Sequence, residues 1–259
     1  MKALLLAGGY ATRLRPLTDT TAKPLLPVGG RPMVDWIVDR IEDAGPVDEI
    51  HLVTNAVYAA DFERWARARR VAVWNDGTRS NEDRLGALGD IAFAIERGGL
   101  VDDDLLVIAA DNLFEFSLRE YVDFFRLKGD GSAVAAHRLA DASLARLYGV
   151  IELDDDDRVV AFEEKPEQPK SDLVATAAYI FDRRHVPLLR RYLDEGNPPD
   201  PPGRFIVWLY ARAPVYGYRF DESWFDIGDP AQLLEADNRY RELAGLPTRS
   251  EYTLDLSTN

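Results

Sequence analysis

The feature that most limits how this chain can fold is a glycine pair placed directly after an apolar segment. Residues 1–7 (MKALLLA) favour a buried β-strand, and Gly8 and Gly9 follow at once. Because glycine has no Cβ, such a pair lets the backbone turn sharply and approach a ligand closely. The free N–H groups of this kind of loop can surround an anion. A glycine pair alone is more often a simple turn, so the interpretation depends on its neighbours.

Three basic residues follow the glycine pair. Arg13 and Arg15 come first, and Lys23 lies ten residues after Arg13. Surface arginines and lysines are usually only solvated. Here they come after a loop with bare backbone donors, and this combination suits a polyphosphate because charge and N–H groups can meet its oxygens together. The sequence therefore predicts a phosphate site in this loop.

The first half of the chain alternates between strand-like and helix-like patterns. Nearly continuous apolar runs predict strands at 1–7, 49–54, 71–74 and 104–110. Apolar residues at helical spacing predict helices at 32–44, 59–69, 88–96 and 118–128. This alternation indicates an α/β fold with a mostly parallel sheet covered by helices on both faces. Ligands of such sheets bind beyond the carboxyl ends of the strands, where Gly8, Asn75 and Asp111 fall.

The second half is richer in strands. We predict strands at 133–137, 149–153, 159–165, 175–182 and 215–218, and a helix at 230–243. The acidic run 154–157 favours a hairpin turn, and the proline-rich segment 197–203 favours a rigid connector, with a lid or a domain edge as the alternatives. We expect one domain over 1–259, with a first half at about 1–130, an inserted β-rich lobe at about 131–229, and a C-terminal helix and tail at 230–259.

Charge and composition exclude several classes of function. The net charge is −14, and an acidic surface argues against binding a nucleic-acid polymer or an anionic membrane. The chain has no cysteine, which excludes disulfides and thiolate chemistry, and three scattered histidines are too few for a zinc cluster. The apolar start is too short for a signal peptide, and no segment is long enough to span a membrane. We therefore expect a cytoplasmic protein.

Two aspartates stand where a nucleotide-bound metal could be held. Asp111 ends the segment VIAADN, and Asp226 lies in ESWFDIGDP. An aspartate at the end of a strand can bind Mg²⁺ through oxygen while the metal keeps water and phosphate ligands. Taken alone, each aspartate is more simply a turn former or a helix N-cap. Asp229 is expected to cap the helix that begins at the following proline.

The longest motif resembles a known enzyme family. The strings GG-x-x-TRL-x-PLT and KPLLPV, at residues 8–18 and 23–28, resemble the signature of the sugar-1-phosphate nucleotidylyltransferases, also called NDP-sugar pyrophosphorylases. The resemblance extends to about residue 244. It implies a Rossmann-like core with an inserted sugar-binding lobe, and a reaction that joins a nucleoside triphosphate to a sugar 1-phosphate with release of pyrophosphate.

The resemblance also implies roles for particular residues. Arg13 and Lys23 would be the catalytic cations, with Arg15 as a helper, and Asp111 and Asp226 would bind Mg²⁺. The residues implied in nucleotide binding are Leu6, Ala7, Gly8, Gly9, Asn81 and Gly86. Those implied in sugar-phosphate binding are Tyr148, Gly149, Glu164, Lys165 and Thr176. For Gly86, the alternative is that a glycine only permits close packing of the helix that it opens.

Some positions depart from the family pattern. Ala11 stands where the family commonly has glycine, which is costly only if the backbone φ angle there is positive. Ala177 replaces a common glycine of the sugar pocket, and residues 198–210 differ from the segment that bacterial thymidylyltransferases carry. No hexapeptide-repeat β-helix follows, so we expect no acyltransferase activity.

The sequence therefore predicts a nucleotidylyltransferase that uses dTTP or UTP and glucose 1-phosphate. One alternative is transfer to a non-sugar phosphate acceptor such as phosphocholine. Another is a catalytically silent, nucleotide-sensing subunit, although Arg13, Lys23, Asp111 and Asp226 are all present. The expected partners are small-molecule substrates only, and the sequence leaves open whether the chain forms a homo-oligomer.

Overall fold

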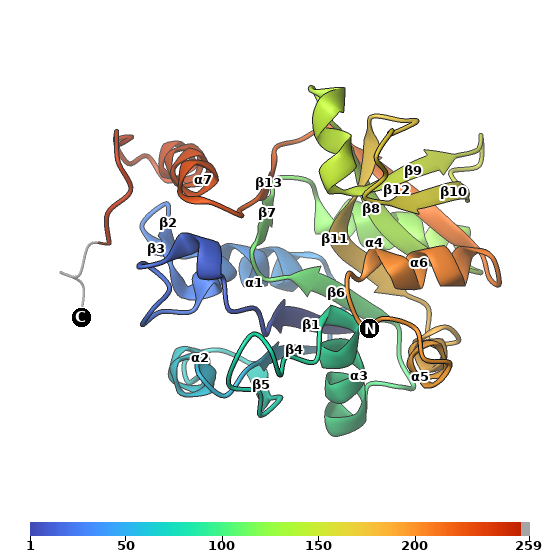
Figure 1. The fold of residues 1–259 in the computed structure, drawn as a ribbon, viewed down its shortest axis with the longest axis horizontal. Helices are drawn as coiled ribbons and strands as arrows, with labels where there is room; N and C mark the ends of the chain where they lie inside the picture. Colours follow the sequence, from blue (N-terminus) through green and yellow to red (C-terminus); the bar gives the residue numbers. More distant parts are fainter. Residues whose placement is uncertain (255–259) are drawn as a thin grey trace.

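One nine-stranded sheet runs through the molecule. The computed structural model describes residues 1–254. Seven strands follow the order β10-β9-β11-β6-β1-β4-β5, and β8 and β12 extend the sheet beside β11 (Figure 1). The strands of this sheet are β1 (Lys2–Ala7), β4 (Glu49–Thr54), β5 (Val71–Asn75), β6 (Leu105–Ala109), β8 (Ser132–Arg138), β9 (Gly149–Leu153), β10 (Val159–Glu164), β11 (Leu173–Phe181) and β12 (Val215–Phe220).

The first half of the chain forms the parallel part of this sheet. β1 lies in the middle and pairs in parallel with β4 and β6, and β4 pairs in parallel with β5. Successive residues of β1 point to opposite faces, so Ala3 and Leu5 join one apolar core and Leu4 joins the other. Both cores are fully buried, which explains the continuous apolar run in the sequence.

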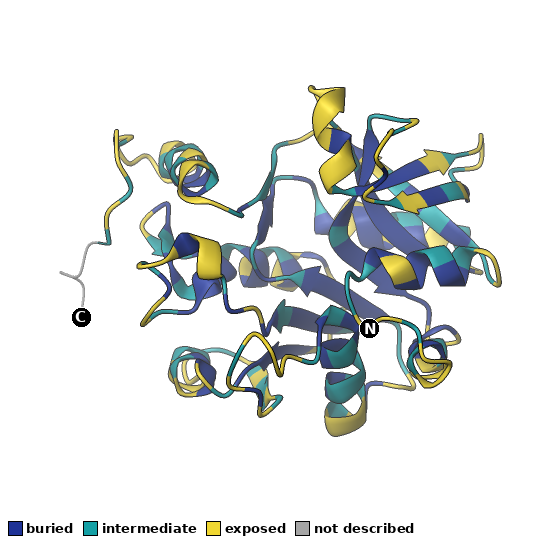
Figure 2. Cartoon of the chain, viewed as in Figure 1, coloured by how far each residue is buried: buried dark blue, intermediate teal, exposed yellow. Residues whose placement is uncertain are grey.

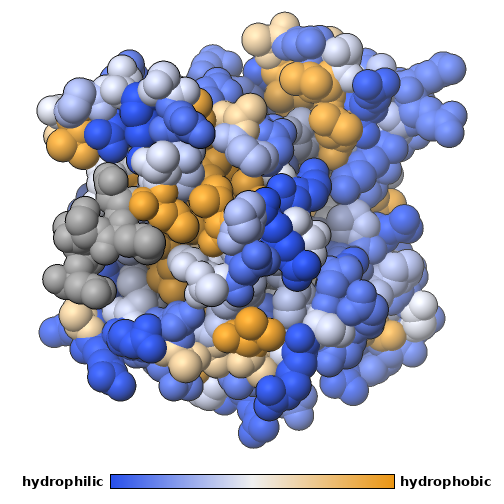
Figure 3. All heavy atoms as spheres, turned by 60° about the vertical axis from the view of Figure 1, so that its left-hand side comes forward, coloured by the Kyte–Doolittle hydropathy of each residue, from blue (hydrophilic) through white to orange (hydrophobic). Residues whose placement is uncertain are grey.

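Helices cover both faces of the sheet, as predicted (Figure 2). The helices that pack on the core with Leu5 are α1 (Met33–Asp43), α2 (Ala59–Ala66), α4 (Leu118–Lys128) and α7 (Pro230–Leu243). Those on the core with Leu4 are α3 (Ala87–Gly98), α5 (Val186–Asp194) and α6 (Gly203–Tyr210). Hydrophilic side chains cover most of the face seen in Figure 3, in keeping with the high charge of the chain.

The inserted β-rich lobe continues the same sheet. β11 pairs antiparallel with β6 of the first half, and it also pairs with β8 and β9 of the lobe. β12 comes back from the C-terminal part of the chain and pairs in parallel with β8. β9 and β10 form the predicted hairpin, in which the Asp154 side chain accepts hydrogen bonds from the N–H groups of Asp156 and Arg158. The lobe is therefore joined to the first half by backbone hydrogen bonds.

Two short ribbons complete the fold. β2 (Pro27–Val28) pairs with β3 (Arg31–Pro32), and α7 packs beside β2. β7 (Asn112–Phe114) pairs antiparallel with β13 (Trp224–Asp226), and Asn112 lies directly opposite Asp226. The 3₁₀ turns are η1 (Thr12–Leu14), η2 (Lys23–Leu25) and η3 (Ala142–Leu147). No helix within residues 1–254 combines the length and the apolar character needed to cross a membrane.

The structure corrects several sequence predictions. α2 ends at Ala66 rather than 69, and α5, α6, β7 and β13 were not predicted. α6 follows the proline-rich segment and is apolar on nearly all sides, so its sequence has little of the polar–apolar spacing that marks a surface helix. The end of the expected tail, residues 255–259, lies outside the described residues.

Candidate active site

A cavity of about 220 Å³ lies beyond the carboxyl end of β1. Its lining includes Leu6 and Ala7 from the end of β1, Gly9 from the predicted phosphate loop, and Arg13 and Lys23 from the two 3₁₀ turns that follow. Asp111 lines it from the end of β6. The cavity therefore combines backbone groups, two cations and one carboxylate at the edge where ligands of parallel sheets bind.

The loop that forms this cavity is held from behind by side chains of the neighbouring strand. The Thr54 hydroxyl donates to the carbonyl oxygen of Ala7 at 3.1 Å, and the Asn55 amide donates to that of Gly8 at 3.0 Å. Ala11 has a φ of +43°, so this substitution for glycine falls on a left-handed residue and is costly. The Thr18 hydroxyl supports that conformation by donating to the Ala11 carbonyl at 2.9 Å.

Lys23, Asp111 and Asp226 converge on one point, although Asp226 follows Lys23 by about two hundred residues of sequence. The Lys23 ammonium lies 2.7 Å from a carboxylate oxygen of Asp111. The Asn112 amide donates to Asp111 at 3.1 Å and to Asp226 at 3.0 Å, so it holds the two carboxylates side by side. The Trp224 indole donates to the side-chain oxygen (Oδ1) of Asn112 at 2.9 Å and fixes the direction of the side-chain amide. One asparagine thus orients both acids.

The two carboxylates differ in their proton affinity. Burial would raise the pKa of Asp111, but the charge and the hydrogen bond of Lys23 outweigh this and lower it below its ordinary value. Burial, followed by the charge of Asp111, raises the pKa of Asp226, and Lys23 and Arg13 only partly compensate. A further positive charge placed between the two acids would therefore stabilise the ionised form of Asp226 more than that of Asp111.

A second cavity of about 180 Å³ adjoins the carboxylates on the lobe side. Asn112 and Asp226 form one wall, and Tyr148, Gly149, Glu164 and Lys165 line it from β9, β10 and the turns beside them. Four of the five residues implied in sugar-phosphate binding therefore lie in one hollow. Thr176 does not line it: its hydroxyl donates to the Ala135 carbonyl at 3.0 Å, while its neighbours Ala175 and Ala177 face the cavity.

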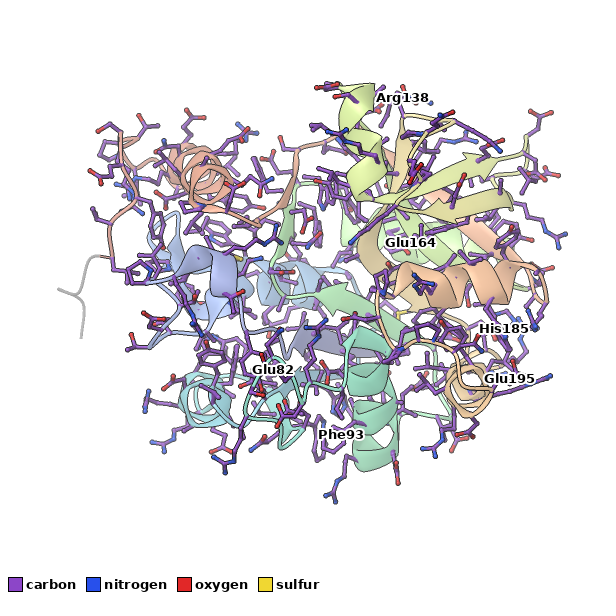
Figure 4. The ribbon with its side chains drawn as sticks, in the orientation of Figure 1. Glu82, Phe93, Arg138, Glu164, His185 and Glu195 are labelled. Carbon is purple, nitrogen blue, oxygen red and sulfur yellow. The ribbon has the colours of Figure 1, made fainter. Side chains whose placement is uncertain are left out.

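Glu164, labelled in Figure 4, lies at the end of β10 and close to two glycines. A Cβ added at Gly149 would come within 3.2 Å of its carboxylate, and one added at Gly203 would collide with it. Burial raises the pKa of Glu164, and the charge of Asp200 adds to this effect against Lys165 and Arg204. The two glycines therefore leave room for a carboxyl group that a bound hydroxyl could approach.

The two residues implied in base recognition lie outside both cavities. Gly86 has a φ of +78° and begins α3, and a Cβ there would meet the Pro199 carbonyl oxygen at 3.0 Å. Asn81 is exposed, and its side-chain oxygen accepts a hydrogen bond from Arg84 at 2.8 Å. The structure does not bring Asn81 against the phosphate cavity.

Two residues of the site region, Asn112 and Asp90, were not predicted from the sequence. Asn112 follows Asp111 directly, and only the pairing of β7 with β13 reveals that it contacts Asp226. Asp90 lies in the first turn of α3 beneath Gly8, and a Cβ at Gly8 would come within 2.4 Å of its carboxylate. Burial first, and then the nearby Asp76, raises the pKa of Asp90 to about 8. The sequence signal for Asp90 was an acidic residue at a position where the helical spacing of 88–96 expects an apolar one.

The chain is similar to known proteins over most of its length. A family model described as "Nucleotidyl transferase" matches residues 2–242. A glucose-1-phosphate thymidylyltransferase of Streptomyces antibioticus is 38% identical over the whole chain, which covers 70% of that protein. A mannose-1-phosphate guanylyltransferase of Mycobacterium tuberculosis is 31% identical over 90% of the chain, and the bifunctional protein GlmU of Methanocaldococcus jannaschii is 28% identical over 93%.

The chain spans 62% of the length of the Mycobacterium relative and 54% of the Methanocaldococcus relative. A solved structure of a Bacillus anthracis protein, described as a glucose-1-phosphate thymidylyltransferase in complex with sucrose, matches with a TM-score of 0.80. It is 24% identical, and the match covers 93% of this chain and 96% of that one, so it shows the same fold. The chain belongs to the nucleotidyl transferase family, and the relatives that it resembles include sugar-1-phosphate nucleotidylyltransferases.

Proposed function

We propose that this protein transfers a nucleoside monophosphate from a nucleoside triphosphate to a sugar 1-phosphate and releases pyrophosphate. The observation that carries the proposal is the meeting of two cavities at one pair of carboxylates. Asp111 lines the cavity with the glycine loop, and Asp226 lines the cavity with Glu164. A triphosphate in the first and a sugar phosphate in the second would place the reacting groups between the two aspartates.

The residues of the first cavity suit the triphosphate. Backbone N–H groups at Gly9 and the guanidinium of Arg13 would bind phosphate oxygens, and Lys23 would lie beside the α-phosphate. A phosphate oxygen of the acceptor attacks the α-phosphorus and forms the new P–O bond. The bond between the α- and β-phosphates breaks, and its electron pair leaves with pyrophosphate. The cations stabilise the charge that develops on both groups.

The donor set fits Mg²⁺. Asp111 and Asp226 present oxygen ligands, and the pKa of Asp226 is raised first by burial and then by the charge of the nearby Asp111. Within residues 1–254 no cluster of three or more potential metal ligands is found, so water and phosphate oxygens would complete the shell. When bound, Mg²⁺ would neutralise charge on the phosphates and help to align them.

The favoured substrates are dTTP or UTP and glucose 1-phosphate. The relative that is 38% identical carries the name of a glucose-1-phosphate thymidylyltransferase, which supports this choice. Other relatives are named for guanylyl transfer, so the base is the finer part of the proposal. Glu164 would accept hydrogen bonds from sugar hydroxyl groups, and Lys165 would neutralise the sugar phosphate.

A grid of four nucleoside triphosphates against several sugar 1-phosphates, read as pyrophosphate release, tests the proposal. We expect Mg²⁺-dependent release that requires both substrates, with the highest rate for dTTP or UTP. Phosphocholine belongs in the grid as a non-sugar acceptor, and a higher rate with it would overturn the sugar assignment. Tight nucleotide binding without turnover for any acceptor would instead indicate a silent sensing subunit.

A further inference from the structure

The segment 197–203 (NPPDPPG), which we call the bridging loop, contacts both substrate sides of the molecule. On the nucleotide side, the Pro199 carbonyl oxygen accepts from the Leu88 N–H group at 2.9 Å. On the lobe side, Pro201, Pro202 and Gly203 line the cavity that contains Glu164. The loop is thus a wall of the acceptor cavity and a support for the start of α3.

Asp200 is the charged residue of this loop, and it pairs with the segment before α3. Its carboxylate accepts from the Ala87 N–H group at 3.2 Å and lies 3.4 Å from an Arg84 guanidinium nitrogen. Another nitrogen of Arg84 donates to the side-chain oxygen of Asn81 at 2.8 Å. A continuous set of hydrogen bonds therefore joins Asn81, the residue implied in reading the base, to the loop that walls the acceptor cavity.

The start of the bridging loop is anchored to α5. The Tyr192 hydroxyl donates to the Pro198 carbonyl oxygen at 2.9 Å, and the Asn197 amide donates to the Tyr192 carbonyl oxygen at 2.8 Å. Four prolines restrict the backbone of the loop itself. A displacement of Asp200 is therefore passed to Pro201 and Gly203 rather than absorbed within the loop.

The charge of Asp200 also acts on an acidic group in each half of the site, Asp90 and Glu164. It adds to the effect of burial in raising the pKa of Asp90, beneath the phosphate loop, and that of Glu164, in the acceptor cavity. Arg84 and Asp200 are each partly exposed, with 45% and 39% of their side chains accessible. A pair of this exposure is weak in the free protein, so ligand binding can strengthen or reorient it.

We propose that Arg84 and Asp200 are positioning residues that couple occupation of the base site to the shape of the acceptor cavity. A base bound at Asn81 orders Arg84, Arg84 then holds Asp200, and the bridging loop is fixed as the wall against which the sugar phosphate binds. Part of the ordering cost is met by the first ligand, so the second binds more tightly. The inference rests on the proposed function.

The test measures how strongly one ligand assists the other. With the pair of substrates that reacts fastest in the grid, calorimetry gives the dissociation constant of the sugar 1-phosphate alone and with the Mg²⁺ complex of an α,β-methylene analogue of the triphosphate. We expect the analogue to tighten sugar-phosphate binding about five-fold or more in the wild type. Asp200→Asn keeps an oxygen for the Ala87 N–H group, and both it and Arg84→Gln should bring the ratio close to one.

Further variants and outcomes decide the inference. In the double variant of Arg84 and Asp200, the ratio of the two dissociation constants should fall no further than in either single variant, because the two residues form one contact. Asp194→Asn, at an exposed acid paired with Arg190 on α5, serves as the matched control and should keep the wild-type ratio. A ratio of one in an active wild type, or an unchanged ratio in both variants, would overturn the coupling, whereas absence of turnover throughout the grid would overturn the proposed function itself.

Discussion

At the scale of single residues, the site is organised by one buried amide. Asn112 donates to Asp111 and to Asp226 through the same side-chain nitrogen. Lys23 lies on the other side of Asp111, so each carboxylate has a defined partner before any substrate binds. Preorganised groups of this kind stabilise developing charge without reorganising during the reaction.

Replacing either acid by its amide tests this arrangement. Asp111→Asn and Asp226→Asn should each lower kcat by about 100-fold or more, because each removes a charge from the centre where the phosphates meet. Pyrophosphate release at saturating Mg²⁺ measures the effect, with circular dichroism to check the fold. Asp229→Asn, three residues from Asp226, is the matched control, and it should keep its turnover because an asparagine can still cap α7. Full activity in either site variant would exclude that residue from the reaction.

Asp90 should make the stability of the protein depend on pH. Its pKa is raised from 3.8 in the unfolded chain to about 8 in the folded protein, chiefly by burial and then by Asp76. Between these two values the folded protein holds a proton that the unfolded chain releases. The free energy of unfolding must therefore fall as the pH rises through this interval, by up to about 1.4 kcal/mol per pH unit.

Asp90→Asn should remove this slope. Urea unfolding at pH 5 and at pH 8 would give a smaller difference for the variant than for the wild type, and the variant should be the more stable protein at pH 8. Asp155→Asn, in the exposed hairpin turn, should keep the wild-type slope. Equal slopes for the wild type and Asp90→Asn would show that Asp90 is ionised in the folded protein at neutral pH.

At the scale of elements, the sequence predicts the bounds of a helix or strand best where neighbouring residues in the chain determine them. α7 begins and ends as predicted, because Asp229 caps it by accepting from the N–H groups of Ala231 and Gln232, and proline occupies its first position. β1, β4 and β9 also have the predicted bounds to within one residue. These elements carry their own signals in caps, glycines and apolar runs.

Two of the elements that were missed, the strands β7 and β13, depend on distant partners. β7 and β13 have three residues each, and Asn112 and Asp226 are 114 residues apart in sequence. Strands this short have no periodicity to detect, so their pairing appears only in the folded chain. The resemblance to a family supplied Asp111 and Asp226, but the partner that orients both, Asn112, could not be inferred from spacing.

The cap of α7 allows a prediction about stability. Asp229→Ala removes the acceptor for two backbone N–H groups and should lower the free energy of unfolding by about 0.5–2 kcal/mol. Chemical denaturation gives this value. Asp229→Asn should lie close to the wild type, since it keeps an oxygen at the same place. If Asp229→Asn lost as much free energy of unfolding as Asp229→Ala, the charge of Asp229, rather than the cap geometry, would be what stabilises the helix.

At the scale of the whole molecule, one sheet unites the two halves. β11 pairs with β6 of the first half and with β8 and β9 of the lobe. Because these contacts are backbone hydrogen bonds within a continuous ladder, neither half can unfold without exposing strand edges of the other. The glycine-loop cavity and the lobe cavity therefore belong to one structural unit in residues 1–254.

This continuity predicts a single unfolding transition. In a variant that keeps Trp208 as its only tryptophan, lobe fluorescence and far-ultraviolet circular dichroism should give the same urea midpoint. A second variant that keeps only Trp36, which lies on α1, reports on the first half and should agree with both. Separate midpoints for Trp36 and Trp208 would mean that the halves unfold independently.

The ribbon of β7 and β13 has an evolutionary consequence. The spacing of the two acids is set by one antiparallel register, in which Asn112 faces Asp226, and not by the length of chain between them. Turns between residues 114 and 224 that lie outside the shared sheet, such as residues 154–157, can therefore change in length while the carboxylates stay in place. A slip of one position in the ribbon, by contrast, would turn Asp226 away from its partner Asn112 and separate the two acids.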